Sequence, residues 1–216
     1  MDWDRARYLM VEQQIRPWDV LDSKVLQRLF DVKREEFVPA DKKELAFVDV
    51  ALPLPNGNSM LEPKLEARLL QDVELKASDR VLVVGAGTGY LVALAAGLAK
   101  QVIGVEIDLD LKHAAEANLL RAGIKNARIE EGNGLAAANP GAPFDAIILT
   151  GSVAEVPVVL REQLADGGRL IAIVGELPIM SAVRVTRAGA AFGDTKLFEF
   201  NLPRLHSASD KSQFVF

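Results

Sequence analysis

Residues 81–90 read VLVVGAGTGY, a continuous apolar run that is closed by three glycines. Four apolar residues in a row, without polar alternation, are typical of a strand that is buried on both faces of a sheet. Glycines directly after such a strand allow a tight turn, and they let a ligand approach the backbone without meeting a Cβ atom. The stretch therefore predicts an α/β fold with a ligand-binding loop at the end of a sheet strand.

The chain on the C-terminal side of this loop alternates between two kinds of pattern. Helical patterns cover residues 88–99, 109–122 and 156–164, and short apolar runs cover residues 102–105, 127–129, 146–149 and 169–174. Alternating strands and helices predict a doubly wound, mostly parallel sheet with helices on both faces. The alternation ends after residue 180, where residues 182–187 and 198–200 indicate an antiparallel finish.

The N-terminal part of the chain has a different pattern. The first forty residues read as helices, with Asp22 placed to cap the second of them, and Pro63 suits the first turn of a later helix. We therefore expect residues 1–78 to form a helical cap with a substrate-side segment. Residues 79–216 would form the cofactor-binding domain, and the two parts would make one structural unit.

The composition narrows the chemistry that the chain can perform. Its 216 residues contain no cysteine, which excludes disulfide scaffolds, thiolate metal sites and cysteine nucleophiles, and we expect no bound metal. Lysine and arginine number 25 against 30 aspartates and glutamates, so the net charge is −5. Because nucleic-acid binding depends on a basic excess or a basic face, nucleic acid is not an expected partner.

The apolar segments argue against membrane insertion. No run reaches the roughly 18 apolar residues that a membrane span requires. No apolar segment of the signal-peptide type follows the N-terminal residues Met1 to Arg5. We therefore expect a cytoplasmic protein whose partners are small molecules or proteins, and no membrane partner.

The spacing of the glycines indicates which ligand the loop binds. Gly85, Gly87 and Gly89 form a G-x-G-x-G pattern, which is associated with S-adenosylmethionine sites, whereas the dinucleotide fingerprint would place its third glycine at Tyr90. Taken alone, the loop could also be a simple strand-to-helix turn. Glu106 adds to the signal because it ends the next predicted strand, 21 residues after Gly85, where a carboxylate can accept hydrogen bonds from ribose hydroxyls.

A third feature completes the predicted cofactor site. Gly132, Asn133 and Gly134 follow the third predicted strand, where the edge of an adenine would lie. The predicted cofactor is S-adenosyl-L-methionine, with S-adenosyl-L-homocysteine as its product. The predicted cofactor-binding residues are Gly85, Gly87, Gly89, Glu106, Gly132 and Asn133.

Several short segments along the chain resemble the sequence motifs of a known protein family. Residues 10–15 (MVEQQI), 34–39 (REEFVP) and 46–49 (AFVD) look like N-terminal signatures, and residues 81–90, 143–148 and 162–170 match later boxes. Together they resemble the protein-L-isoaspartate O-methyltransferase family, within the class I S-adenosylmethionine-dependent methyltransferases. The resemblance implies a Rossmann-like fold, methyl transfer to the carboxylate of a protein or peptide, and a role in protein repair.

Three positions depart from the family's pattern. The segment that the family writes roughly as G-x-T-I-S-x-P reads GNSMLEP over residues 57–63, so Leu61 stands where the resemblance implies a catalytic serine. Ser59 carries the nearest hydroxyl, and in an extended segment it would share the face of Leu61. Val83 replaces an acidic residue, and Asn133 replaces the aspartate of a G-D-G step. The candidate catalytic residues are therefore Ser59 and the substituted Leu61.

Methyl transfer to a carboxylate suits a chain with only two histidines. The nucleophile has a pKa of about 4, so it is ionised at pH 7 and needs no general base. We interpret His113 as a solvent-facing helix residue, and His206 as a tail residue that has a substrate contact as its alternative role.

Three functions remain open from the sequence. The first is an isoaspartyl-type methyltransferase. The second is a methyltransferase that uses a different small-molecule or protein carboxylate as acceptor. The third is a non-catalytic descendant that binds a nucleoside or a partner protein.

Overall fold

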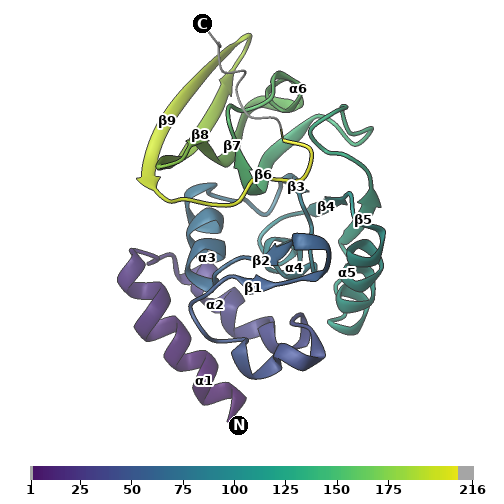
Figure 1. Cartoon of the computed structure of the whole chain (residues 1–216). Helices are drawn as coiled ribbons and strands as arrows, with labels where there is room; N and C mark the ends of the chain where they lie inside the picture. Colours follow the sequence, from purple (N-terminus) through teal and green to yellow (C-terminus); the bar gives the residue numbers. More distant parts are fainter. Residues whose placement is uncertain (1, 209–216) are drawn as a thin grey trace, which may run out of the picture.

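The computed structural model describes residues 2–208, and a seven-stranded sheet lies at its centre, with the strand order β5-β4-β3-β6-β7-β8-β9 (Figure 1). The strands are β3 (Arg80–Val84), β4 (Gln101–Glu106), β5 (Ala127–Glu131), β6 (Phe144–Val153), β7 (Leu164–Glu176), β8 (Ile179–Ala188) and β9 (Ala191–Glu199). Strands β3 to β7 pair in parallel, and β8 and β9 add two antiparallel strands at one edge. The predicted fold class, including its antiparallel finish, is confirmed.

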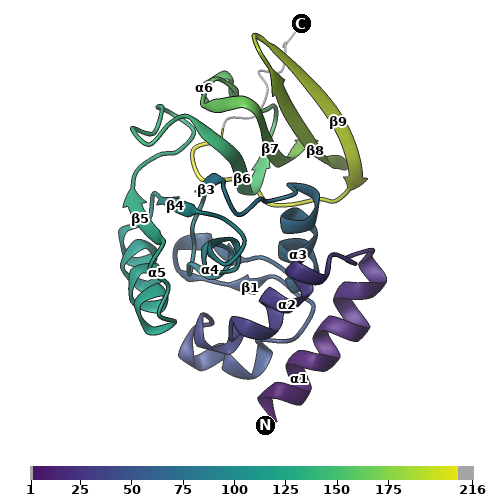
Figure 2. The ribbon, with the colours of Figure 1, turned by 180° about the vertical axis from the view of Figure 1, so that it is seen from behind.

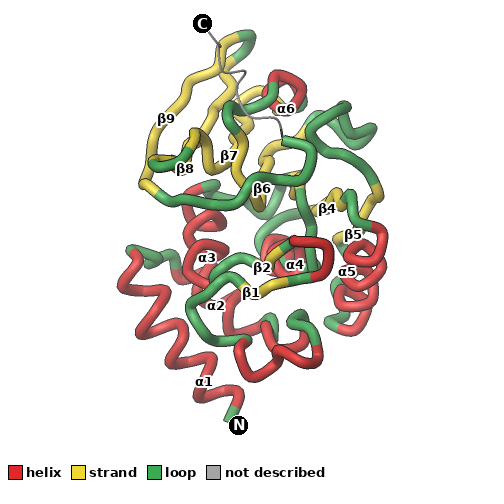
Figure 3. Tube along the Cα trace, in the orientation of Figure 1, coloured by secondary structure: helices red, strands yellow, loops and turns green. Residues whose placement is uncertain are grey.

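Along the sequence, the helices lie in the N-terminal part of the chain and in the connections between the parallel strands. They are α1 (Trp3–Met10), α2 (Ser23–Asp31), α3 (Pro63–Asp72), α4 (Tyr90–Ala96), α5 (Leu109–Arg121) and α6 (Val158–Glu162), with shorter turns η1 (Val11–Ile15), η2 (Arg16–Trp18), η3 (Arg34–Glu36), η4 (Ala40–Leu45) and η5 (Pro55–Gly57). Seen from the front and from behind, α1 and α2 lie at the opposite end of the molecule from the β8–β9 hairpin (Figures 1 and 2). Figure 3 shows the same division between the helical end and the strand-rich end.

Alternate residues of β3 explain why helices cover both faces of the sheet. Val81 and Val83 belong to a buried cluster that includes residues of α3, α4 and α5, whereas Leu82 and Val84 belong to a second cluster that includes Leu160 of α6. Successive side chains of a strand point to opposite faces. Each face of β3 is therefore apolar and covered, which is what its unbroken apolar run predicts.

Local signals set where the helices begin. The Asp22 carboxylate accepts hydrogen bonds from the backbone amides of Lys24 and Val25, so it caps α2 as expected. Pro63 is the first residue of α3, also as expected. Helix α4 is shorter than its pattern predicts at both ends, because Gly89, at a left-handed φ of 84°, forms its N-cap and Gly97 forms its C-cap.

The N-terminal part and the sheet share one hydrophobic core. Buried side chains of α2 and α3, such as Leu29 and Leu69, lie in the same cluster as Val81 and Ile148 of the sheet. The division of the chain at residue 78 remains a prediction, and its last eight residues lie outside the described part. None of the helices in residues 2–208 is long and apolar enough to cross a membrane.

The cap of α2 provides a test of this local analysis. Asp22→Ala removes the acceptor of two amide hydrogens, so we expect it to lower the free energy of unfolding by about 1 kcal/mol. Asp41→Ala is the control, because Asp41 makes an ion pair with Lys42 at an exposed position, and such pairs contribute about 0–1 kcal/mol. Urea denaturation of both variants measures the difference, and equal losses would contradict the assigned cap.

Candidate active site

The register of the parallel strands brings four loops to one edge of the sheet. Val84 pairs with Val105 and Leu149, and Glu106 pairs with Glu131, so the carboxyl ends of β3, β4, β5 and β6 lie close together. A cleft of about 730 Å³, part of it open to solvent, lies at this edge. Open α/β sheets bind their ligands in clefts at this position, outside the carboxyl ends of the strands.

Three parts of the chain line the cleft. The sheet loops contribute Val84, Gly85, Gly87, residues 105–107, residues 132–135, Thr150 and Gly151; the N-terminal part contributes Leu54 and residues 57–59; the C-terminal segment contributes residues 202–206. Of the sequence-predicted site residues, the structure brings together Ser59, Gly85, Gly87, Glu106, Gly132 and Asn133.

The glycine loop packs too closely to accept a side chain at Gly85. Its φ is 85°, and a Cβ atom added there would lie 2.3 Å from Oγ1 of Thr150. That hydroxyl donates a hydrogen bond to the carbonyl oxygen of Gly85 at 2.6 Å. Gly89, in contrast, lies outside the cleft lining and faces Ala115 of α5. Gly89 therefore serves the packing of α4 against α5.

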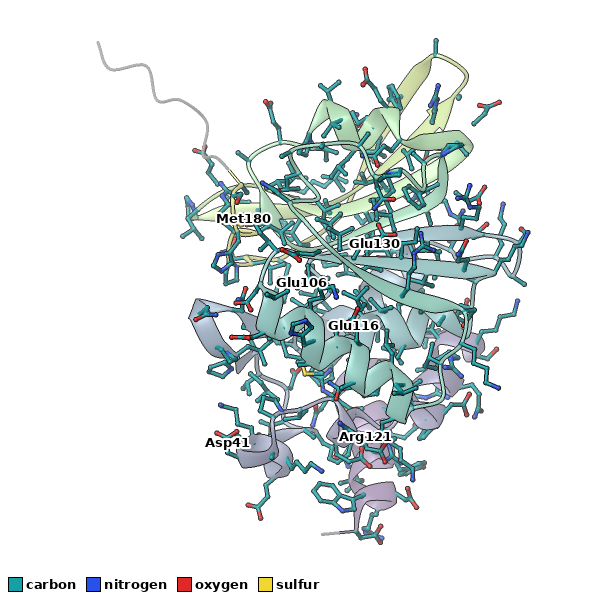
Figure 4. All side chains as sticks on the ribbon, turned by 90° about the vertical axis from the view of Figure 1, so that its right-hand side faces the viewer. Asp41, Glu106, Glu116, Arg121, Glu130 and Met180 are labelled. Carbon is teal, nitrogen blue, oxygen red and sulfur yellow. The ribbon has the colours of Figure 1, made fainter. Side chains whose placement is uncertain are left out.

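Glu106 lies at the end of β4 and is only 4% exposed. Its Oε2 accepts a hydrogen bond from the amide of Gly87 at 2.7 Å, and its Oε1 accepts from the amides of Ile107 and Asp108 at 2.9 and 3.0 Å. A carboxylate offers about four acceptor positions, so one remains open on Oε2. Glu106 thus fixes the glycine loop and keeps one acceptor position for a ligand. Figure 4 shows Glu106 near the middle of the molecule.

The loop after β5 forms the next part of the cleft. The amide of Gly132 donates to the carbonyl oxygen of Glu106 at 2.9 Å, which ties this loop to β4. Oδ1 of Asn133 accepts from the amide of Leu135 at 3.0 Å, so the side chain stabilises its own turn. Asn133 therefore keeps its side-chain amide nitrogen, and a second acceptor position on Oδ1, for a ligand.

The N-terminal part reaches across the mouth of the cleft. Nδ2 of Asn56 donates to Oδ2 of Asp108 at 2.5 Å, and Asp108 also caps α5 through the amides of Asp110 and Leu111. The hydrogen bond from Asn56, followed by that from Leu111, lowers the pKa of Asp108 below its usual range. Asp108 therefore stays ionised and joins the two sides of the cleft.

Ser59 and Leu61 lie in different surroundings. Ser59 is exposed and lines the cleft, whereas Leu61 is 5% exposed and packs in the hydrophobic core. The expected common face is absent because the short strand β2 (Ser59–Met60), paired with β1 (Leu52–Pro53), ends before Leu61. Val83 likewise packs in the core, and its neighbour Val84 lines the cleft.

The C-terminal segment is a part of the site of which the sequence analysis identified only His206, with a substrate contact as its alternative role. The amide of Ser152 donates to the carbonyl oxygen of Pro203 at 2.8 Å, and the amide of Leu205 donates back to Ser152 at 3.0 Å. A Cβ atom at Gly151 would lie 2.8 Å from Cγ of Leu205, so glycine allows this close approach. His206 lines the cleft through this segment, while His113 is exposed on α5 as expected.

A family model matches nearly the whole of this architecture. The model of protein-L-isoaspartate(D-aspartate) O-methyltransferase (PCMT) matches residues 6–195. The protein-L-isoaspartate O-methyltransferase of Methanoculleus marisnigri is 37% identical over 183 residues, which cover 85% of this chain and 83% of that protein. The protein of the same name from Koribacter versatilis is 37% identical over 187 residues, covering 87% and 83%.

Solved structures show the same fold. A Plasmodium falciparum chain whose name is protein-L-isoaspartate O-methyltransferase, in complex with S-adenosyl-L-homocysteine, superposes with a TM-score of 0.79 at 24% identity. It covers 93% of this chain and 97% of its own. A second structure of that name has a TM-score of 0.80 at 23% identity, covering 94% of this chain and 65% of its own.

The tight packing at Gly85 can be tested against a matched glycine. Gly85→Ala places a methyl group against Thr150, whereas Gly123 has a similar positive φ of 68° and open space around it. We expect Gly123→Ala to cost about 1 kcal/mol of stability through its backbone alone. Gly85→Ala should cost about 2 kcal/mol more because of the clash. Urea denaturation measures both, and equal losses would contradict the described packing.

Proposed function

The chain belongs to the protein-L-isoaspartate O-methyltransferase family, and from this we propose that it transfers the methyl group of S-adenosyl-L-methionine to the carboxylate of isoaspartyl residues in proteins or peptides. One observation carries the assignment within the molecule: the cleft combines the glycine loop with the buried carboxylate of Glu106. In this proposal the protein acts in the cytoplasm, where the reaction serves protein repair.

The residues of the cleft fit the proposed cofactor. The open acceptor position of Glu106 suits a ribose hydroxyl, and the amide nitrogen of Asn133 suits a ring nitrogen of adenine. Gly87 has open space where a side chain would stand, which leaves room for the methionine part, whereas at Gly85 that space is filled by Thr150 and Leu205. When bound, S-adenosylmethionine supplies a methyl group on a positively charged sulfonium.

Methylation of the acceptor carboxylate requires no general base among the side chains of the chain. A carboxylate is ionised at neutral pH, so no group of the chain has to remove a proton. The chain has to align the two reactants and exclude water, which can lower the barrier by roughly 7–11 kcal/mol. Ser59 lines the cleft with its hydroxyl, and we assign it to donate a hydrogen bond to the acceptor carboxylate.

The position of Leu61 also supports a second function, methyl transfer to a different acceptor. Its side chain packs in the core and brings no hydroxyl to the cleft. The acceptor end of the cleft then depends on Ser59 and on the C-terminal segment, which includes Arg204 and His206. This set also suits a small-molecule or protein carboxylate other than isoaspartate.

The proposed reaction can be measured directly. With labelled S-adenosylmethionine, we expect the protein to methylate a peptide that contains one isoaspartyl residue and to leave the same peptide with ordinary aspartate unmodified. Equal labelling of the two peptides would indicate a different acceptor, and labelling of neither would contradict isoaspartyl methyl transfer.

Calorimetric titration with S-adenosylhomocysteine separates an enzyme of another specificity from a non-catalytic descendant. We expect binding to the wild type and a weakening of about tenfold or more in Glu106→Gln, because one charge-assisted hydrogen bond is lost. Glu116→Gln on the exposed face of α5 is the control, and its affinity should match the wild type (Figure 4). Absence of binding to the wild type would exclude both enzymatic functions.

The role assigned to Ser59 has its own test. Ser59→Ala removes one hydroxyl from the cleft, so kcat/KM for the isoaspartyl peptide should fall about tenfold, the cost of one hydrogen bond to a charged group. Affinity for S-adenosylhomocysteine should stay unchanged. Ser23→Ala, at an exposed position of α2, should have no effect on either quantity. A wild-type value of kcat/KM in Ser59→Ala would show that Ser59 has no role at the acceptor site.

A further inference from the structure

The cleft is covered by a loop that leaves the helical part of the molecule and returns to it. This roof loop (residues 47–60) includes β1, η5 and β2, and it lies between η4 and α3 (Figure 1). Its tip contributes Gly57, Asn58 and Ser59 to the cleft lining. The position of the tip over the cleft therefore depends on how the two ends of the roof loop are held.

One buried side chain holds both ends. Nε of Arg34 donates to the carbonyl oxygen of Ala46 at 2.9 Å, and Nη2 donates to the carbonyl oxygen of Leu61 at 2.6 Å. Ala46 and Leu61 directly flank the roof loop. The planar fork of the guanidinium suits this arrangement because its nitrogen atoms donate in fixed directions.

The surroundings of Arg34 keep this contact firm. Arg34 is 0% exposed, its Nη1 forms an ion pair with Glu66 of α3, and its guanidinium lies 4.9 Å from the ring centre of Tyr90. Hydrogen bonds away from water are stronger than exposed ones. Burial raises the pKa of Glu66 to about 7, and the charge of Arg34 opposes that rise. Arg34 is thus fixed from three sides.

The tip of the roof loop is held less firmly. Its hydrogen bond from Asn56 to Asp108 lies at an exposed position. Because water competes for exposed hydrogen bonds, such a contact restrains the loop weakly. The buried contacts at the ends, together with the buried side chains of Leu52, Leu54 and Met60 within the loop, therefore determine the resting place of the roof loop.

We propose that Arg34 is a positioning residue for methyl transfer, which acts by joining Ala46 to Leu61 and so setting where the roof loop places Ser59 against the acceptor. This inference rests on the proposed function for its catalytic part. The groups that Arg34 contacts, namely Ala46, Leu61, Glu66 and the ring of Tyr90, lie outside the cleft lining and are not predicted cofactor-binding residues. Loss of the contact should therefore lower kcat and leave cofactor affinity nearly unchanged.

The chain offers a matched control in Arg169. It is also buried, and it donates to the carbonyl oxygens of Val73 at 2.7 Å and Asp145 at 2.9 Å while it pairs with Asp79. Asp79 and Asp145 lie at the amino ends of β3 and β6, away from the cleft edge, and Val73 directly follows α3. Arg34→Lys and Arg169→Lys therefore both keep the positive charge and lose a buried guanidinium that donates hydrogen bonds to backbone carbonyl oxygens. Only Arg34→Lys should affect the roof loop.

The experiment compares these two variants in three measurements. We expect Arg34→Lys to lower kcat for the isoaspartyl peptide by about tenfold to a hundredfold, since a misplacement of about 1 Å can cost about a hundredfold. Its dissociation constant for S-adenosylhomocysteine should stay within about threefold of the wild type, since those contacts come from the sheet loops. Hydrogen–deuterium exchange in residues 47–60 should become faster. Arg169→Lys should leave kcat and this exchange at wild-type values.

A further variant separates the hydrogen bonds from the charge. Glu66→Gln keeps an acceptor for Nη1 of Arg34, so both carbonyl contacts survive and kcat should stay near the wild type. Wild-type kcat in Arg34→Lys, or an equal loss in Arg169→Lys, would overturn the proposal. If the wild type methylates neither peptide, the proposed function fails by itself, and unchanged exchange in residues 47–60 of Arg34→Lys would still overturn the role of Arg34.

Discussion

The carboxylate of Glu106 joins three backbone amides that come from two different loops. Through Gly87 it fixes the glycine loop after β3, and through Asp108 it fixes the start of α5, whose cap in turn holds the roof loop by Asn56. The contact forms only because parallel pairing ends β3 and β4 at the same edge. The shape of the cleft therefore depends on this one carboxylate and on the register beneath it.

The three parts of the chain that line the cleft have different proposed roles. The sheet loops carry Glu106 and the glycines, which suit the cofactor, while the proposed function assigns the acceptor to the side of the roof loop and the C-terminal segment. Val83 and Leu61 are both buried in the core, so neither side chain opens or blocks the cleft directly. The acceptor then has to be recognised by residues of the roof loop and the C-terminal segment.

Most of the fold could be predicted because its signals are local. Unbroken apolar runs such as residues 81–84 mark buried parallel strands, and the glycine spacing with Glu106 marks the cofactor edge. Arg34 escaped prediction as a positioning residue because its partners at residues 46, 61 and 66 are brought together only by tertiary packing. For the same reason, only His206 of the C-terminal segment was considered from the sequence, because the contacts of residues 203–205 with Ser152 form only in the folded chain. Leu61 lies outside the cleft lining because β2 ends one residue earlier, which no periodicity reveals.

The most direct test of this account is a crystal structure of the protein with S-adenosylhomocysteine and an isoaspartyl peptide. We expect a ribose hydroxyl to hydrogen-bond to Oε2 of Glu106, and the peptide carboxylate to lie under the roof loop within hydrogen-bond distance of Ser59. A ligand bound away from Glu106, or a peptide carboxylate that does not reach Ser59, would contradict the account.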